Sequence, residues 1–189
     1  MSLSTVWQVL DIAWVVSEVV IAVGTRTRRG GGDVRDRGTL LLLWIAIVSA
    51  LTAGNWFAEV SDVGRLPHAQ WLRPVALGML VAGLVLRWSA VLSLGRAFSS
   101  NVAIRASQTV MKTGLYRWMR HPSYSGLILV FLAAGAHTRN WVAFLIITVP
   151  TTAMLLYRIH VEEIALREHF GAEYIEYSER TKRLVPGLY

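Results

Sequence analysis

Long runs of apolar residues constrain this chain more than any other feature of its sequence. Three of them approach or match the length of about 20 residues that an α-helix needs to cross a bilayer. These lie at 5–23, 39–58 and 71–93. Two shorter runs, 122–136 and 141–157, follow a polar stretch. Because a backbone in lipid must satisfy its own hydrogen bonds, such runs form helices. We therefore predict an all-α, polytopic integral membrane protein with about five transmembrane helices and a C-terminal cytoplasmic helix.

Composition supports a membrane protein and argues against several other classes. Hydrophobic residues make up 54% of the chain and charged residues only 16%, whereas soluble domains have about 25% charged residues. The basic residues behind the net charge of +7 lie between the apolar runs, which suits membrane lipids better than nucleic acid. Because the chain has no Cys, disulfides, thiol nucleophiles and Cys-based metal sites are excluded, and we expect no metal.

The distribution of basic residues orients the helices. Arg and Lys concentrate in the loop 24–38, in the segment 94–121 and in the tail 158–189, whereas the connections 59–70 and 137–140 carry one Arg each. By the positive-inside rule, the N-terminus lies outside and the tail lies in the cytoplasm. The segment 94–121 and the tail are then expected on the same face of the membrane.

Two regions of different character divide the chain. Residues 1–93 hold the first three spans, and no Lys or Arg precedes the first of them, so we interpret it as a retained helix and not a signal peptide. Residues 94–189 combine the polar segment 94–121, a helical hairpin 122–157 and the tail 158–189. Polar side chains concentrate in this second region, so we expect it to carry the chemistry.

The segment 117–126 places three cationic or titratable side chains directly before a proline and an apolar run. The fixed φ of Pro122 suits a first helical position, and the N–H groups of a first turn can hold an anionic group. Taken singly, these residues have structural interpretations, because His121 can be a helix-entry residue and Arg117 and Arg120 can be headgroup anchors. The segment indicates a binding site only together with a second cluster.

The tail supplies this second cluster. On a helix, Arg158 and Glu162 lie one turn apart on the same face. An exposed pair of this kind contributes only about 0.3–0.5 kcal/mol and can be purely structural. At the headgroup boundary, however, Arg158 can hold a carboxylate bidentately, and Glu162 can accept hydrogen bonds from a ribose or an amino group. Glu18 and Arg87, inside apolar runs, are candidates either for lining an acceptor tunnel or for a structural pair.

Residues 114–126 resemble the signature of the isoprenylcysteine carboxyl methyltransferase family of integral membrane methyltransferases. The tail from Arg158 to Tyr177 and the closing segment 183–187 are similar to the C-terminal motifs of the same family, in its order and spacing. The resemblance implies S-adenosylmethionine as methyl donor, S-adenosylhomocysteine as product and a lipophilic or lipidated acceptor.

The resemblance also implies roles for individual residues. Arg158 is expected to be the catalytic residue that faces the acceptor carboxylate, and Glu163 is assigned with it to acceptor binding. The expected cofactor-binding residues are Thr109, Tyr116, Arg117, Trp118, Met119, His121, Tyr124, Leu129 and Glu162. The family usually has His or Gln at the place of Thr109, and Gln108 stands beside it here.

The chemistry of methyl transfer agrees with this reading. A sulfonium methyl group is already activated, so its transfer depends mainly on positioning and desolvation. A carboxylate is ionised near pH 7 and needs no strong general base. The sequence thus predicts a carboxyl O-methyltransferase whose isoprenylcysteine-like acceptor enters from the lipid, while the cofactor arrives from the cytoplasm.

Other functions stay open at this point. A phospholipid headgroup amine N-methyltransferase would need Glu162, Glu163 or His121 to accept a proton. Membrane sterol reductases resemble this fold and use a nicotinamide cofactor, but the sequence has no Gly-rich dinucleotide loop. A non-enzymatic small membrane protein, such as a transporter, predicts an internal repeat or paired polar residues in several spans, and no repeat is evident.

Overall fold

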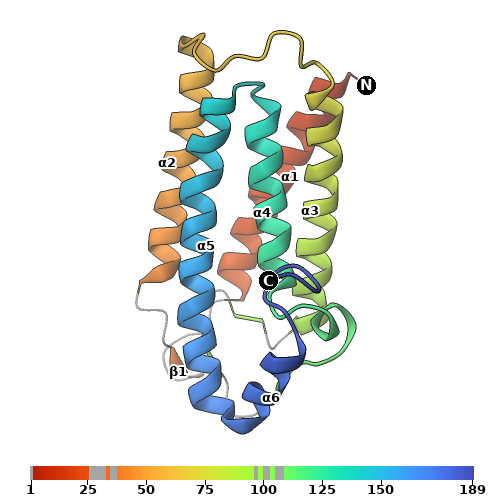
Figure 1. Cartoon of the computed structure of the whole chain (residues 1–189), viewed down its shortest axis with the longest axis vertical. Helices are drawn as coiled ribbons and strands as arrows, with labels where there is room; N and C mark the ends of the chain where they lie inside the picture. Colours follow the sequence, from red (N-terminus) through yellow and green to blue (C-terminus); the bar gives the residue numbers. More distant parts are fainter. Residues whose placement is uncertain (1, 26–32, 35–37, 96–97, 100–102, 105–108) are drawn as a thin grey trace.

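Five apolar helices form an elongated bundle in the computed structural model of the chain (Figure 1). The structure describes residues 2–25, 33–34, 38–95, 98–99, 103–104 and 109–189. The bundle helices are α1 (Leu3–Gly24), α2 (Thr39–Val60), α3 (Leu72–Leu94), α4 (Pro122–His137) and α5 (Trp141–Phe170). The short helix α6 (Ala172–Arg180) and the 3₁₀ turn η2 (Gly114–Arg117) lie at the end where α4 begins. Two-residue strands, β1 (Asp33–Val34) and β2 (Ala103–Ile104), pair antiparallel.

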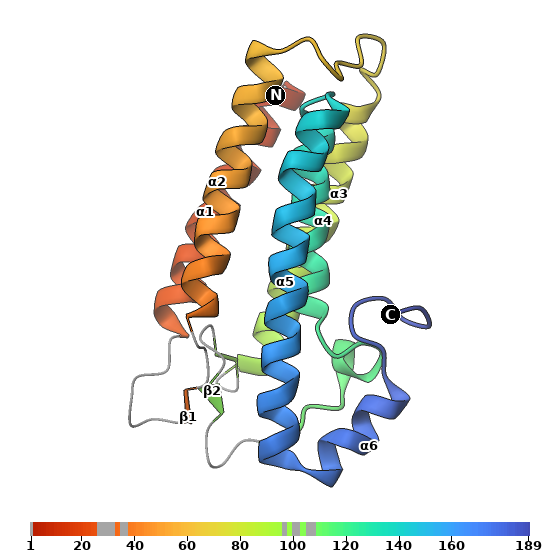
Figure 2. The ribbon, with the colours of Figure 1, turned by 60° about the vertical axis from the view of Figure 1, so that its left-hand side comes forward.

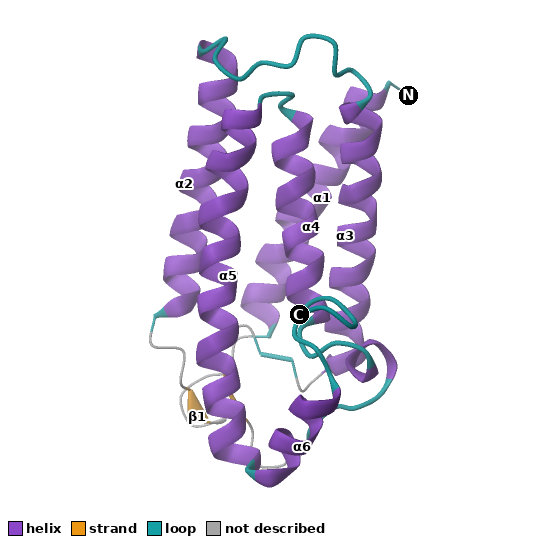
Figure 3. Cartoon of the chain, viewed as in Figure 1, coloured by secondary structure: helices purple, strands orange, loops and turns teal. Residues whose placement is uncertain are grey.

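The predicted all-α membrane architecture is confirmed (Figure 3). Helices α1, α2, α3 and α5 are long and apolar enough to cross a membrane, and α4 is a shorter apolar helix. Helix α5 continues past residue 157, the expected end of the hairpin, to Phe170, so the last apolar run and the polar helix expected after it begin as one helix. Glu, Ala, Leu and Arg favour helix there, and the helix ends only at Gly171, whose φ is 55°. Much of the loop 24–38 and part of the segment 94–121, including Gln108, lie outside the described residues.

Helix α4 is the centre of the bundle. It packs along α3 on one side and along α5 on the other, and α5 also packs along α2 (Figure 2). Small residues allow close approach: a Cβ atom at Gly126 would lie 2.7 Å from the carbonyl oxygen of Gly83. Such contacts are typical of membrane helices, whose association depends on van der Waals packing. Phe131 and Ala133 are fully buried, so the short helix α4 is shielded by its longer neighbours.

Helix α1 has the fewest contacts with the other bundle helices, and a buried ion pair ties it to α3. The guanidinium of Arg87 donates to both carboxylate oxygens of Glu18 at 2.9 Å, and it also donates to the hydroxyl of Ser123 on α4. The outer faces of α1 and α2 expose apolar side chains such as Val20 and Leu41. This pattern suits helices that face lipid.

Candidate active site

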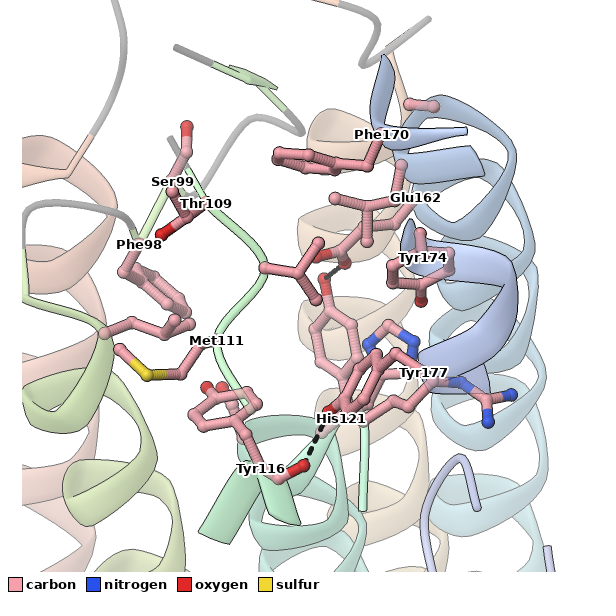
Figure 4. Close-up of a pocket in the computed structure, with 17 residues that line it drawn as sticks. Phe98, Ser99, Thr109, Met111, Tyr116, His121, Glu162, Phe170, Tyr174 and Tyr177 are labelled. Atoms are coloured by element: carbon pink, nitrogen blue, oxygen red, sulfur yellow. Dashed lines mark hydrogen bonds between the residues drawn. The ribbon is translucent and has the colours of Figure 1, made fainter. Parts of the chain in front are cut away.

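A pocket opens at the end of the bundle where α4 begins (Figure 4). It holds about 880 Å³ of space including its open mouth. Its walls come from the segment before α4, from the first turn of α4 and from α5 and α6. The lining residues are Leu94, Phe98, Ser99, Thr109, Val110, Met111, Tyr116, Arg120, His121, Ser123, Tyr124, Glu162, Ala165, Leu166, Phe170, Tyr174 and Tyr177.

The pocket brings together residues from both sequence motifs. The prediction that the segment 94–121 and the tail lie on the same face of the membrane requires this proximity. Of the predicted cofactor-binding residues, five line it: Thr109, Tyr116, His121, Tyr124 and Glu162. Pro122 is the first residue of α4, as predicted, and it follows His121 at the N-cap position. The first turn of α4 therefore forms part of the pocket wall.

Four predicted cofactor-binding residues lie outside the lining of this pocket. Successive side chains of a helical turn point in different directions, so the inward position of Tyr116 in η2 directs its neighbours outward. Trp118 is 60% exposed and lies under the guanidinium of Arg117. The Sδ atom of Met119 accepts from the Ser125 hydroxyl. The remaining residue, Leu129, faces Gly83 of α3. The geometry gives these four no contact with the pocket.

Tyr124 connects the two charged residues of the tail cluster. Its hydroxyl donates to Oε2 of Glu162 at 2.8 Å and accepts from Nε of Arg158 at 3.0 Å. Nη1 of Arg158 donates to the hydroxyl of Thr39 on α2 at 2.9 Å. Arg158 is only 2% exposed, so its guanidinium is held in one orientation between α2, α4 and α5.

Arg158 lines a second pocket, on the side of α1 and α2. Its walls are mainly apolar: Trp14, Ile21, Ala22, Leu40, Leu43, Trp44, Ile47 and Leu127. Glu18 and Arg87 also line it, so the ion pair that joins α1 to α3 is also part of the pocket wall. The two pockets share three lining residues, Phe98, Ser99 and Tyr124.

Glu163, the neighbour of Glu162, is directed to a different set of contacts. Its carboxylate accepts from Nε of Arg120 at 2.8 Å and from Nε of Arg183 at 3.0 Å, and Nε2 of His121 lies 3.4 Å away. The side chain is 4% exposed. Because Arg120 and Arg183 already pair with the carboxylate, the predicted contact of Glu163 with an acceptor is not supported by the geometry. Consecutive residues on a helix point about 100° apart, which separates Glu163 from Glu162.

The C-terminal segment closes one side of the first pocket. The hydroxyl of Tyr177 donates to the carbonyl oxygen of Tyr116 at 2.6 Å. The backbone N–H groups of Arg120 and His121 donate to the carbonyls of Lys182 and Arg183. These bonds hold α6 in place as one wall of the pocket.

Several lining residues were missing from the sequence-based site. Tyr174 and Tyr177 lie three residues apart on α6, so their shared helical face was a usable signal, whereas Phe170 ends α5 before the break at Gly171. Phe98 and Ser99 belong to no periodic pattern. Thr39, the partner of Arg158, is 119 residues away in the sequence, and no local pattern connects the two.

The pocket offers neutral hydroxyls and one carboxylate. Burial raises the pKa of Tyr177 to about 12. Burial is also the main cause that raises the pKa of Tyr116 and of Tyr174, and the nearby acidic residues add to it. These phenols therefore stay protonated near neutral pH and act as hydrogen-bond donors. Among the described residues, no group of three or more His, Asp or Glu side chains is placed to hold a metal ion.

Comparisons with known proteins converge on one family. Residues 76–168 match the isoprenylcysteine carboxyl methyltransferase (ICMT) family. Protein-S-isoprenylcysteine O-methyltransferase B of Arabidopsis thaliana is 27% identical over 172 residues, which cover 90% of this chain and 86% of that protein. The protein-S-isoprenylcysteine O-methyltransferase of Tribolium castaneum is 30% identical over 75% of this chain and 50% of its own length.

A solved structure shares the fold. It is that of the eukaryotic intramembrane Ras methyltransferase ICMT, with a TM-score of 0.60 and 28% sequence identity. The match covers 76% of this chain and 52% of that one, so the matched part is about half of the longer eukaryotic protein.

Proposed function

The chain belongs to the isoprenylcysteine carboxyl methyltransferase family, and from this premise we propose that it transfers a methyl group to the carboxylate of a lipophilic, isoprenylcysteine-like acceptor. We assign the methyl donor, S-adenosylmethionine, to the pocket between α4, α5 and α6. The acceptor is assigned to the pocket beside α1 and α2, with Arg158 as its carboxylate-binding, catalytic residue.

The shared wall of the two pockets carries this proposal. Methyl transfer requires that donor and acceptor meet in line at a short distance. Phe98, Ser99 and Tyr124 line both pockets, so two ligands can meet there. On the donor side the Tyr124 hydroxyl contacts Glu162, and on the acceptor side it contacts Arg158. A binding protein for a single ligand would need only one of these pockets.

The donor pocket fits S-adenosylmethionine by its chemistry. The carboxylate of Glu162 can accept hydrogen bonds from ribose hydroxyls or an amino group, and the aromatic rings of Phe98, Phe170 and Tyr174 can attract a cation. When bound, the donor supplies a methyl group activated by the positive sulfonium. Thr109 and His121 add polar atoms to the same wall.

The acceptor pocket supplies one well-held cation in an apolar setting. Arg158 is fixed by Tyr124 and Thr39, so it can orient a carboxylate with little loss of side-chain entropy. Because that carboxylate is already ionised near pH 7, the protein needs to remove no proton. The apolar side chains of the pocket keep water away from the reacting oxygen.

The membrane supplies the route for the acceptor. The exposed apolar faces of α1 and α2 lie next to the acceptor pocket, so an isoprenoid or similar chain can reach it from lipid. We place the donor pocket on the cytoplasmic face, because the basic tail and part of the basic segment before α4 gather at that end.

The test uses the full chain in lipid nanodiscs with labelled S-adenosylmethionine and a farnesylated cysteine acceptor. Arg158→Ala should keep donor binding and lose turnover, whereas Glu162→Ala should weaken donor binding. The matched control Arg180→Ala changes an exposed Arg of α6 and should alter neither. Absence of donor binding by the wild-type chain would overturn the proposal.

The product identifies the acceptor group. A methyl ester is released by mild base, whereas an N-methyl product is stable. A base-stable product formed from lipid extracts, with none formed from the prenylated carboxylate, would replace this proposal with headgroup amine methylation.

A further inference from the structure

A cleft lies at the opposite end of the bundle from the donor pocket, and the proposed reaction makes no use of it. It forms where the first turns of α1 and α3 meet the last turn of α4, near the N-terminus marked in Figure 1. It holds about 650 Å³ of space including its mouth. Its lining residues are Leu3, Ser4, Trp7, Arg73, Leu77 and His137.

The polar groups of this cleft favour an anion. Arg73 is exposed, and among the described residues no acidic side chain forms an ion pair with it. Burial and the positive charges of Arg73 and Arg139 lower the pKa of His137, so Arg73 is the cation of the lining. The Nδ1 atom of His137 is buried and has no hydrogen-bond partner in the described part of the chain. None of the six described lining residues is acidic. The N-terminal end of α1 adds positive potential.

One wall of the cleft is rigid and flat. The rings of Trp7 and His137 stack with centroids 3.8 Å apart and planes 11° from parallel. This stack ties the first turns of α1 to the end of α4, and Leu77 adds an apolar surface beside it. A ligand with a charged group and an apolar part can therefore contact both kinds of wall.

Exposed tryptophans place the cleft at the level of lipid headgroups. Trp56 near the end of α2, Trp71 before α3 and Trp141 at the start of α5 all lie at this end, with exposed fractions of 62%, 62% and 54%. Tryptophans gather at the interface between membrane and water. The guanidinium of Arg73 therefore lies at the level of the layer that contains lipid phosphates.

We propose that this cleft binds the phosphate of an anionic phospholipid headgroup, with Arg73 as the main contact. The N-terminal end of α1 adds positive potential to the site, and Trp7 and Leu77 contact the glycerol and the start of the acyl chains. Because the lining has no carboxylate to pair with an ammonium group, a headgroup with net negative charge is preferred over a zwitterionic one.

The test measures lipid retention by the full chain. The purified protein is equilibrated in detergent with equal amounts of phosphatidylglycerol and phosphatidylcholine and examined by native mass spectrometry. We expect the wild-type chain to retain phosphatidylglycerol selectively. Arg73→Gln should bind it about fivefold more weakly, the effect of one arginine charge near a lipid surface. Arg73→Lys should keep most of the preference.

Two controls make the result specific. Arg65→Gln removes an exposed charge that is paired with Asp62 and does not line the cleft, so it should leave retention unchanged. His137→Gln should weaken retention, and it serves as a second probe if Arg73→Gln does not fold. Equal retention by the wild type and by Arg73→Gln, or equal losses in Arg73→Gln and Arg65→Gln, would overturn the proposal.

A third arm separates the possible sources of the phosphate. Inorganic phosphate is added at millimolar concentration to the protein loaded with phosphatidylglycerol. If the lipid stays bound, the acyl and glycerol contacts contribute and the ligand is a lipid. Alternatively, phosphate displaces the lipid from the wild type and raises the Tm of the wild type but not that of Arg73→Gln. The cleft then binds the phosphate group itself. This outcome supports anion binding at Arg73, with free phosphate as the ligand in place of a lipid.

Discussion

Tyr124 is the residue on which the two halves of the proposed site depend. Its single hydroxyl joins Arg158 to Glu162, and its ring lies against that of His121 with centroids 5.6 Å apart. The hydroxyl thus sets the position of Arg158, the proposed acceptor-binding residue, relative to Glu162, the proposed donor-binding residue. A change at this atom should affect alignment more than the affinity for either ligand.

Tyr124→Phe tests this role. Without the hydroxyl, Arg158 keeps its charge but loses one of its fixing contacts, so kcat should fall roughly 10- to 100-fold. The affinity for the donor should change much less. Tyr157→Phe is the matched control, because Tyr157 is on α5 and 49% exposed, and it should retain wild-type kcat. A normal kcat for Tyr124→Phe would show that the bridge has no role in alignment.

At the scale of elements, the contact between α3 and α4 sets the position of the first turn of α4. Gly83 and Gly126 leave no room for a side chain between the two helices: a Cβ at Gly83 would lie 2.8 Å from the carbonyl oxygen of Gly126. Arg87, one turn after Gly83, and His121, at the start of α4, depend on this spacing.

Gly83→Ala tests the close contact. Overpacking at such a site costs about 1–3 kcal/mol, so Tm in detergent should fall, and activity should fall with it. Gly78→Ala changes a glycine of the same helix with open space around it and should leave Tm unchanged or raise it. The contact would be less tight than described if the two variants had the same Tm.

The carboxylate of Glu163 holds the C-terminal segment against the start of α4. It is shared by Arg120, from the segment before α4, and Arg183, from the segment after α6. Its proposed role is to keep α6, with Tyr174 and Tyr177, over the donor.

Glu163→Gln removes the charge that these arginines share. Loss of one partner from a buried ionic cluster costs about 3–5 kcal/mol, so limited proteolysis should cut the C-terminal segment faster and donor affinity should fall. Glu176→Gln is the control on α6, because its pair with Arg180 is exposed and contributes about 0.3–0.5 kcal/mol. If both variants resist proteolysis like the wild type, Glu163 does not anchor the segment.

At the scale of the whole molecule, the two ends of the bundle have different proposed tasks. The end with α6 holds the donor pocket, and the end with the N-terminus holds the cleft lined by Arg73 (Figure 1). Because five helices cross the bundle, the N-terminus and α6 lie at opposite ends. The orientation proposed for the membrane places α6 in the cytoplasm.

The absence of native Cys makes this orientation measurable. Single-Cys variants Ser2→Cys and Glu179→Cys place a thiol at exposed positions of each end. A membrane-impermeant maleimide should label Ser2→Cys in intact cells, and Glu179→Cys only after permeabilisation. The opposite pattern would reverse the proposed topology, and equal labelling of both in intact cells would contradict an odd number of crossings.

Local patterns were enough to predict the membrane helices and part of the site. Hydropathy depends only on residue type and run length, so the apolar helices appear near their predicted places. Pro122 marks the start of α4 because its ring restricts its own backbone. The one-turn spacing of Arg158 and Glu162 follows from helix geometry. Family motifs also indicated that His121, Tyr124 and Glu162 come together, as they do in the donor pocket.

The tertiary structure decided which of two neighbouring motif residues faces the pocket. Glu162 and Glu163 are adjacent and chemically alike, yet one lines the donor pocket and the other binds Arg120 and Arg183. The contact of Arg158 with Thr39 joins residues 119 positions apart. Helix propensity and hydropathy act over a few residues, whereas the rotation of each helix about its axis is set by packing against the others. By itself, therefore, the sequence determined which segments form apolar helices and which motifs are candidates for the chemistry, and only the packed bundle decided which atoms meet.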